Sequence, residues 1–139
     1  MPPATPGYSG RSLIDKLGIK PGFRIALVDP AAGFPEALGT LPADVTIVGP
    51  RAKDLDVILF FADRASTLEK KMPGAIERLI QSGMLWIAWP KKASGVATDI
   101  TEDVVRRVAL AAGVVDVKVC AITDVWSGLK LVRRLKDRR

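Results

Sequence analysis

The first two thirds of the chain contain four short, nearly apolar runs, over residues 23–28, 45–48, 57–62 and 84–89. Each run is followed directly by proline, glycine or charged residues that break regular structure. Apolar runs of this length are typical of strands that are buried on both faces of a parallel sheet. The pattern therefore predicts four strands, of which the second is short, with their connections starting at well-marked points.

Helical patterns fill the remaining segments. Residues 12–17 predict a short helix, and residues 35–41 predict one or two helical turns. A further helix follows the fourth run and ends at Gly113, with Asp99 and Thr101 as competing N-caps.

The segment between the third and fourth runs contains a conflict. Ser66 and Glu69 have the spacing of a capping box, and apolar residues then recur at helical intervals as far as Ile80. Pro73 interrupts this pattern, and proline is tolerated mainly in the first turn of a helix. We therefore expect a short helix followed by a second helix that begins at Pro73.

The last part of the chain predicts a hairpin. Apolar and polar residues alternate over 114–122, which is typical of an edge strand whose charges discourage pairing with another sheet. A loop over 123–128 and a final strand over 129–134 follow. Two strands this close in sequence pair antiparallel.

Helical connections between the central strands require parallel pairing. We therefore predict an α/β fold with three layers, in which a mostly parallel sheet of about six strands ends in an antiparallel hairpin. With 139 residues the chain is one domain, 1–139. Its N-terminus, residues 1–10, is predicted to be mobile, and its C-terminal end, residues 133–139, is basic.

Composition narrows the class of protein. The chain contains no run near the roughly 18 apolar residues of a membrane span, and no signal peptide is recognised. A single cysteine, Cys120, excludes an internal disulfide, and the absence of histidine excludes His-based catalytic triads and zinc sites. We expect a cytoplasmic protein without membrane contacts.

The net charge of +6 is concentrated at one end, because residues 129–139 carry six basic residues and a single acidic one. Such an end can bind nucleic acid non-specifically. No aromatic residues interleave with these charges, so a solubilising role is the simpler interpretation.

The fourth run leads through Pro90 into a small-residue loop with two lysines. The carboxyl ends of parallel strands are where such sheets bind ligands, and a lysine pair beside exposed amides suits a phosphate or carboxylate. The alternative is a solvated loop whose lysines pair with the carboxylates of Asp99, Glu102 and Asp103 in the following helix. Trp89 and Trp126 are candidates to wall a pocket, with packing at the rim of the sheet as the alternative. Trp86 should point to the opposite face of the strand from Trp89 and belong to the core.

Asp29 and Asp63 each follow an apolar run, so parallel strands would bring two carboxylates together at one edge. Loop capping is the alternative, and nothing completes a metal site. The candidate ligand-binding residues are Asp29, Gly33, Asp63, Trp89, Lys91, Lys92, Ser94 and Gly95.

Two family resemblances follow from these segments. Residues 56–89 resemble the second half of a class I S-adenosylmethionine (SAM)-dependent methyltransferase domain, and residues 115–134 resemble the antiparallel end of its sheet. The chain more closely resembles a family of small bacterial proteins of unknown function, in segments 7–10, 16–20, 89–95, 98–101, 119–121 and 126–129. Both resemblances imply a Rossmann-like, methyltransferase-like fold, and the second implies no established activity.

The chain departs from active methyltransferases at two loops. Those enzymes carry several glycines after the first strand and an acidic residue after the second, for the ribose hydroxyls. Here the first loop, residues 29–35, has one glycine and two prolines, and Gly49-Pro50-Arg51 provides no carboxylate. SAM is therefore a possible cofactor but a disfavoured one.

The favoured hypothesis is a non-catalytic or degenerate methyltransferase-like domain that binds a small ligand or a protein partner. One alternative is a minimal SAM-dependent methyltransferase, or another small-molecule transferase, that uses Asp29, Asp63, Lys91 and Lys92. The other is a nucleic-acid accessory protein that uses the basic C-terminal end.

Overall fold

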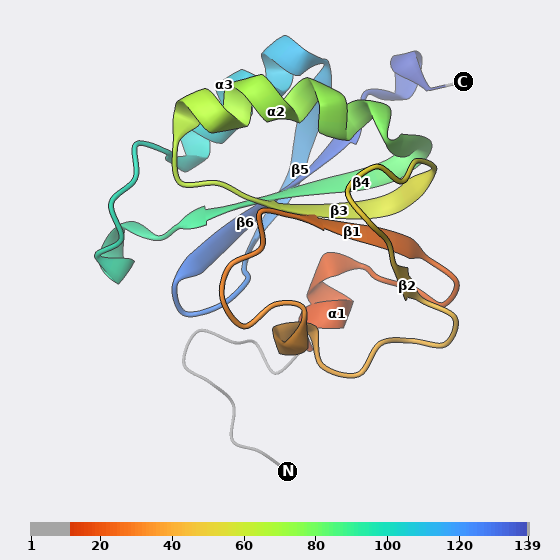
Figure 1. The fold of residues 1–139 in the computed structure, drawn as a ribbon. Coiled ribbons are helices and arrows are strands. Elements are labelled where there is room, and N and C mark those ends of the chain that lie inside the picture. The colour runs from red at the N-terminus through yellow and green to blue at the C-terminus, as the bar shows by residue number, and fades with distance from the viewer. Residues whose placement is uncertain (1–11, 139) are drawn as a thin grey trace.

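A computed structural model describes residues 12–138, so the predicted mobile N-terminus and the matching segment 7–10 lie outside the described residues. Six strands form one sheet in the order β2-β1-β3-β4-β6-β5 (Figure 1). The first four of these are parallel, and β6 runs antiparallel to both β4 and β5. The strands are β1 Arg24–Val28, β2 Thr46–Ile47, β3 Leu55–Phe61, β4 Leu79–Pro90, β5 Val114–Ala121 and β6 Trp126–Arg133.

Helices cover both faces of this sheet (Figure 1). α2 (Ala65–Glu77) and α3 (Glu102–Ala112) lie on one face, and α1 (Leu13–Leu17) lies on the other. A 3₁₀ turn, η1 (Glu36–Leu38), packs beside α1 and is the only regular element that the structure describes between β1 and β2. The prediction of a three-layer, mostly parallel α/β sheet with an antiparallel end is confirmed.

The ends of α1 and α3 are encoded locally. The Thr101 hydroxyl accepts the N–H of Val104 at 3.2 Å, so Thr101 is the N-cap of α3. Gly18 and Gly113 end the two helices in the left-handed conformation, with φ of 76° and 93°.

The prediction for α2 is wrong in two respects. The helix runs continuously through Pro73, and it begins at Ala65 without a capping bond from Ser66. The Ala65 N–H instead donates to a carboxylate oxygen of Asp99 at 2.7 Å, so Asp99 caps α2 rather than α3. The helix continues past its proline because its buried residues lie on both sides of it, at Leu68, Met72, Ala75 and Ile76. Their burial offsets a proline cost of roughly 3 kcal/mol.

Two strands are longer than predicted. β4 begins at Leu79 and β6 begins at Trp126, within the segment predicted as a loop. The extension of β6 follows from antiparallel pairing, which places Trp126 opposite Pro90 and Gly128 opposite Ala88. The alternating strand β5 lies at the sheet edge as predicted, and its register shifts between Asp116 and Lys118. No helix within residues 12–138 has the length and apolar character needed to cross a bilayer.

Candidate functional site

The carboxyl ends of the parallel strands meet at one edge of the sheet. Val28 of β1 pairs with Phe60 of β3, and Phe61 pairs with Ala88 of β4. The loops after β1, β3 and β4 therefore leave from neighbouring points, as the parallel arrangement predicts.

A cavity of about 640 Å³ lies at this edge, beside the end of β4 and beneath the loop that joins β4 to α3. Its wall includes Trp89, which is 6% exposed and packs on the α2/α3 face. The lining residues are Trp89, Pro90, Lys92, Gly95, Val96, Ala97, Thr98, Ile100, Thr101 and Glu102. Three of the predicted site residues, Trp89, Lys92 and Gly95, thus line one cavity.

Lys91 and Ser94 shape the loop above this cavity. The Lys91 N–H donates to the Val125 carbonyl at 2.7 Å, which joins the loop to the turn before β6. The Ser94 hydroxyl donates to the Lys91 carbonyl at 2.6 Å and accepts the N–H of Val96 at 3.2 Å. These contacts occupy the Ser94 hydroxyl in a local turn, and Gly95 follows in the left-handed conformation with φ of 79°.

The far end of the loop is attached to the junction between β3 and α2. The Thr98 hydroxyl donates to the Asp63 carbonyl at 2.7 Å and accepts the Ile100 N–H at 3.0 Å. Asp99 completes the attachment by capping α2. Asp63 therefore anchors the loop through its backbone carbonyl, without lining the cavity, and the loop is fixed at both ends.

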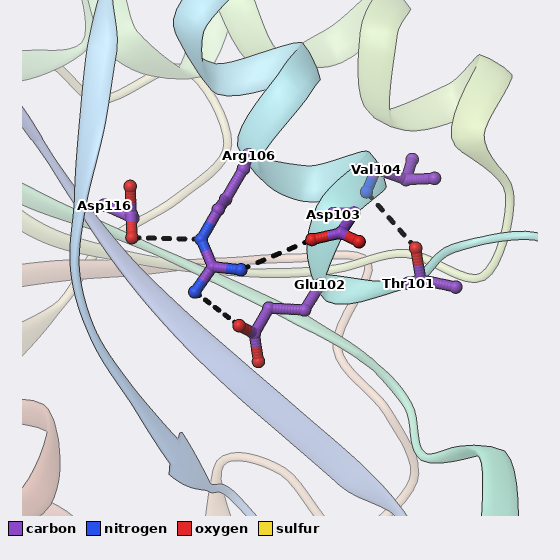
Figure 2. A network of polar contacts seen from close by, with 6 residues as sticks. All are labelled: Thr101, Glu102, Asp103, Val104, Arg106 and Asp116. Carbon is purple, nitrogen blue, oxygen red and sulfur yellow. Dashed lines mark hydrogen bonds and ion pairs between the residues drawn. The ribbon is translucent and has the colours of Figure 1, made fainter.

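Glu102, at the cavity rim, belongs to a network centred on Arg106 (Figure 2). Arg106 forms an ion pair with Glu102, approaches Asp103 at 3.5 Å, and donates to Asp116 of β5 at 3.1 Å. The hydrogen bond to Asp116, with Glu102 contributing, raises the pKa of Arg106. The network holds the first turn of α3 against β5.

This network bears on the solvated-loop interpretation, in which the two loop lysines pair with the carboxylates of Asp99, Glu102 and Asp103. Asp99 accepts from Ala65, and the other two carboxylates pair with Arg106. Within residues 12–138, no ion pair joins Lys91 or Lys92 to a carboxylate. The predicted ion pairs are therefore wrong, although the loop is largely exposed, and Lys92 lines the cavity without a carboxylate partner among the described residues.

Asp29 and Gly33 lie away from this cavity. The Asp29 carboxylate accepts a hydrogen bond from Lys71 Nζ of α2 at 2.6 Å, so it forms an ion pair with a lysine. Asp29 itself has a φ of 48°, a left-handed conformation that aspartate tolerates better than most residues. Gly33 is exposed with φ of 90°, and its carbonyl accepts the Ala37 N–H at 2.7 Å within the turn before β2.

The tryptophans separate onto two faces. Trp89 lines the cavity on the α2/α3 face, whereas Trp126 packs edge-on against Phe61 at 5.1 Å in the core on the α1 face. Trp86 is fully buried on that second face and donates from Nε1 to the Leu17 carbonyl at 3.0 Å. The opposite orientation of Trp86 and Trp89 is confirmed, but Trp89 and Trp126 do not wall one pocket.

Sequence reasoning missed Arg78, which closes the loop after β2. Its guanidinium donates to the carbonyls of Gly49 at 2.9 Å and Ala52 at 2.8 Å, across 29 and 26 residues. Burial lowers the pKa of Arg78. No local pattern indicates so distant a contact. The region where methyltransferases of the resembled class hold ribose with a carboxylate therefore carries a cation here.

The basic C-terminal end is partly structural. The Arg133 guanidinium donates to the carbonyls of Ile76 and Ile80, each at 2.6 Å, near the end of α2. Arg134 pairs with Asp137 at 3.0 Å, and Arg138 donates to the Arg133 carbonyl at 3.2 Å. Among residues 12–138, no group of three or more acidic or cysteine side chains is arranged to hold a metal.

Solved structures share this architecture. A SAM-dependent methyltransferase from Aquifex aeolicus aligns with a TM-score of 0.61 at 15% identity, over 86% of this chain and 86% of that chain. Magnesium protoporphyrin IX methyltransferase from Synechocystis PCC 6803, solved with bound SAM, aligns with a TM-score of 0.62 at 9% identity, over 88% and 74% of the two chains. Fibrillarin from Methanococcus jannaschii, a pre-rRNA processing protein, aligns with a TM-score of 0.56 at 14% identity, over 82% and 67%.

These identities establish a common fold alone. No curated protein sequence matches the chain significantly. The family model described as "Protein of unknown function (DUF3052)" matches residues 48–135, which include β3, β4, β5 and β6. The chain therefore belongs to the DUF3052 family of proteins of unknown function, and it has a methyltransferase-like, Rossmann-like fold.

Proposed function

We propose that this protein is a degenerate methyltransferase-like domain that binds a small ligand beside the end of β4 and does not transfer methyl groups. The observation that carries the proposal is the cavity of about 640 Å³, with Trp89 in its wall and Lys92 lacking a carboxylate partner among residues 12–138. Cavities of this size, largely apolar with a few polar groups, are typical of small-molecule sites.

The lining indicates the class of ligand. Trp89, Ile100 and Val96 offer apolar surface, and Lys92 supplies a cation. Glu102 already forms an ion pair with Arg106. The positive charge of Lys92 is therefore the one that a ligand would complement. We therefore expect a small, mainly apolar or aromatic molecule that carries one carboxylate or phosphate group.

Three features weigh against methyl transfer. The loop after β1 is folded into its own turns, with Phe34 buried and the Gly33 carbonyl bonded to Ala37. The carbonyls of Gly49 and Ala52 after β2 are occupied by Arg78. The cation that holds them is unfavourable for SAM, whose sulfonium and ammonium groups are both positive.

The proposal is tested with aromatic anions, using the three tryptophan indole N–H signals as reporters in NMR. Benzoate and phenyl phosphate should shift the Trp89 signal, whereas Trp86, bonded to Leu17 on the other face, should not move. Lys92→Ala should weaken binding about tenfold. Lys20→Ala, at an exposed lysine outside the cavity, is the matched control, and Val96→Trp should block binding by filling the space.

The proposal is wrong if neither probe moves Trp89 at millimolar concentration, or if Lys92→Ala and Lys20→Ala behave alike. A binding signal that Val96→Trp leaves intact would place the probe elsewhere on the surface.

SAM-dependent methyl transfer is the second candidate, supported by the fold shared with structures that were solved with SAM. Titration with SAM and with its demethylated product, followed by thermal unfolding, separates the two candidates. We expect no stabilisation by either compound. Stabilisation that saturates at low micromolar concentration would favour the methyltransferase, because ligand binding to the native state raises Tm by mass action.

The nucleic-acid hypothesis is weaker, because Arg133 and Arg134 are engaged within the chain itself. Salt-sensitive binding of the full chain to single-stranded DNA or RNA at low ionic strength would revive it.

A further inference from the structure

A second cavity, of about 440 Å³, begins at the carboxyl end of β1 and runs along α2 as far as Arg78, which lies beside the start of β3. It is bounded by β1, by the loop after β2 and by α2, and it shares no lining residue with the cavity at β4. The lining residues are Leu27, Val28, Asp29, Pro50, Lys70, Lys71, Gly74, Ala75 and Arg78.

The charges around this cavity are unbalanced. Lys70, Lys71 and Arg78 supply three cations, and Asp29 supplies the single carboxylate of the lining. Asp29 pairs with Lys71 at 2.6 Å, and no ion pair within residues 12–138 involves Lys70 or Arg78. The cavity therefore keeps two formal positive charges that no described carboxylate neutralises.

The positive charge of Arg78 adds to this charge imbalance, because none of its hydrogen-bond partners among the described residues is negative. Its Nε and one Nη donate to the neutral carbonyls of Ala52 and Gly49, which orient the guanidinium without cancelling its charge. Burial lowers the Arg78 pKa, so the fold holds this cation at an electrostatic cost. An anion placed against it would offset that cost.

The end of the cavity at Val28 and Asp29 lies at a position in the sheet that also favours a ligand. The connection from β1 to β2 passes through η1 on the α1 face, whereas β3 continues into α2 on the opposite face. The strand order thus reverses between β1 and β3, and α/β sheets bind ligands outside the carboxyl ends of their strands at such points. Gly74 and Ala75 have small side chains or none, so the side of α2 that lines the cavity leaves room for a ligand. Val28 and Pro50 add apolar surface.

We propose that the cavity at the end of β1 binds a small organic phosphate, with the phosphate against Lys70, Lys71 and Arg78 and the organic part against Val28 and Pro50. A dianionic phosphate matches two uncompensated positive charges better than a single carboxylate does. This site is separate from the one proposed at β4, and its test uses other residues.

The experiment is calorimetric titration at low salt with three probes: AMP, adenosine and inorganic phosphate. AMP should bind, adenosine should not, and inorganic phosphate should bind at least tenfold more weakly than AMP. Lys70→Ala and Lys71→Ala should each weaken AMP binding about tenfold. Lys20→Ala, at an exposed lysine outside both cavities, is the matched control and should leave the affinity unchanged.

Asp29→Asn provides a test of opposite sign. The substitution removes the one negative charge of the lining and releases Lys71, so AMP should bind several-fold more tightly. Asparagine accepts the φ of 48° at this position, so the fold should be unaffected.

Three results would each overturn the proposal: no binding of AMP at millimolar concentration, an affinity that Lys70→Ala and Lys71→Ala leave unchanged, or weaker binding by Asp29→Asn. Equal affinity for inorganic phosphate and AMP would show that the organic part contributes nothing to binding, which would contradict its proposed contacts with Val28 and Pro50.

AMP also has the chemistry proposed for the cavity at β4, so Lys92→Ala distinguishes the two sites. A loss of AMP affinity in Lys92→Ala, with Lys70→Ala and Lys71→Ala unchanged, would place AMP at β4 and overturn the present proposal alone.

Discussion

Two halves of the parallel sheet are stabilised in different ways. One half consists of β3 and β4, and the other consists of β1 and β2. β3 and β4 have 7 and 12 residues and are packed between helices, whereas β1 and β2 have 5 and 2 residues. The connection between β1 and β2 contains only the turn η1 as described regular structure. The family model begins at residue 48, immediately after β2.

The difference shows how a shortened half of a sheet is stabilised. β3 and β4 depend on continuous apolar packing, with Ile58 fully buried. The loop after β2 depends on directed polar contacts from Arg78, at the end of α2. The loop after β2 is therefore held by a few hydrogen bonds from Arg78, although β1 itself pairs with β3 and buries Ile25 and Ala26. Substitutions should separate the two modes of stabilisation.

The largest effect is expected for Ile58→Ala in β3. Removing a fully buried aliphatic side chain leaves a cavity and should lower the free energy of unfolding by about 3 kcal/mol. Ile47→Ala in β2, where the side chain is 38% exposed, should cost less than about 1 kcal/mol. Urea unfolding measures both, and equal losses would contradict the proposed contrast.

Arg78→Gln should lower the free energy of unfolding by about 2 kcal/mol, because it leaves the carbonyls of Gly49 and Ala52 without their donors. Hydrogen exchange should accelerate over residues 46–55 and stay unchanged over 84–90. Arg78→Lys should be intermediate, since a lysine lacks the planar fork that reaches both carbonyls. Uniform acceleration across the sheet would mean that Arg78 supports the whole fold.

Asp99→Ala should cost about 1 kcal/mol of stability, because the Ala65 N–H at the start of α2 loses its acceptor. Asp99→Asn should retain most of that stability, since asparagine is also a good N-cap. Ser66→Ala, at the residue that the sequence favours as a cap, should have almost no effect. A larger loss from Ser66→Ala than from Asp99→Ala would reverse the assignment.

The smallest effect concerns Lys130 of β6, which lies directly opposite Lys118 of β5. Partial burial, together with the charge of Lys118, lowers the pKa of Lys130 below its ordinary value of 10.5. In the window between the lowered pKa and 10.5, the unfolded chain binds more protons, so this group makes stability rise with pH.

Lys130→Met should therefore stabilise the protein by a few tenths of a kcal/mol at neutral pH. The advantage over the wild type should shrink as pH rises through that window. Chemical unfolding at pH 7 and at pH 10 checks both statements, and an advantage that grows with pH would contradict them.

Most of the fold could be predicted from local patterns, and the candidate site only in part. Trp89, Lys92 and Gly95 were predicted from a strand-to-loop junction, and they line one cavity. The sequence did not indicate the distant partners: Asp29 pairs with Lys71, 42 residues away, and Trp126 packs on the opposite face of the sheet from Trp89. Pro73 shows the same limit, because burial on both sides of it overrides a local preference.

The sequence by itself determined the central strands and their common direction, the two glycine-ended helices and the edge position of β5. These features depend on periodicity and turn residues, which act within a few positions of the chain. The tertiary structure alone decided that Asp99 caps α2, that Arg106 of α3 bonds to Asp116 of β5, and that Arg78 closes the loop after β2. These contacts join different elements, across 34 residues for Asp99 and up to 29 for Arg78, and they depend on strand register and helix placement that no local pattern encodes.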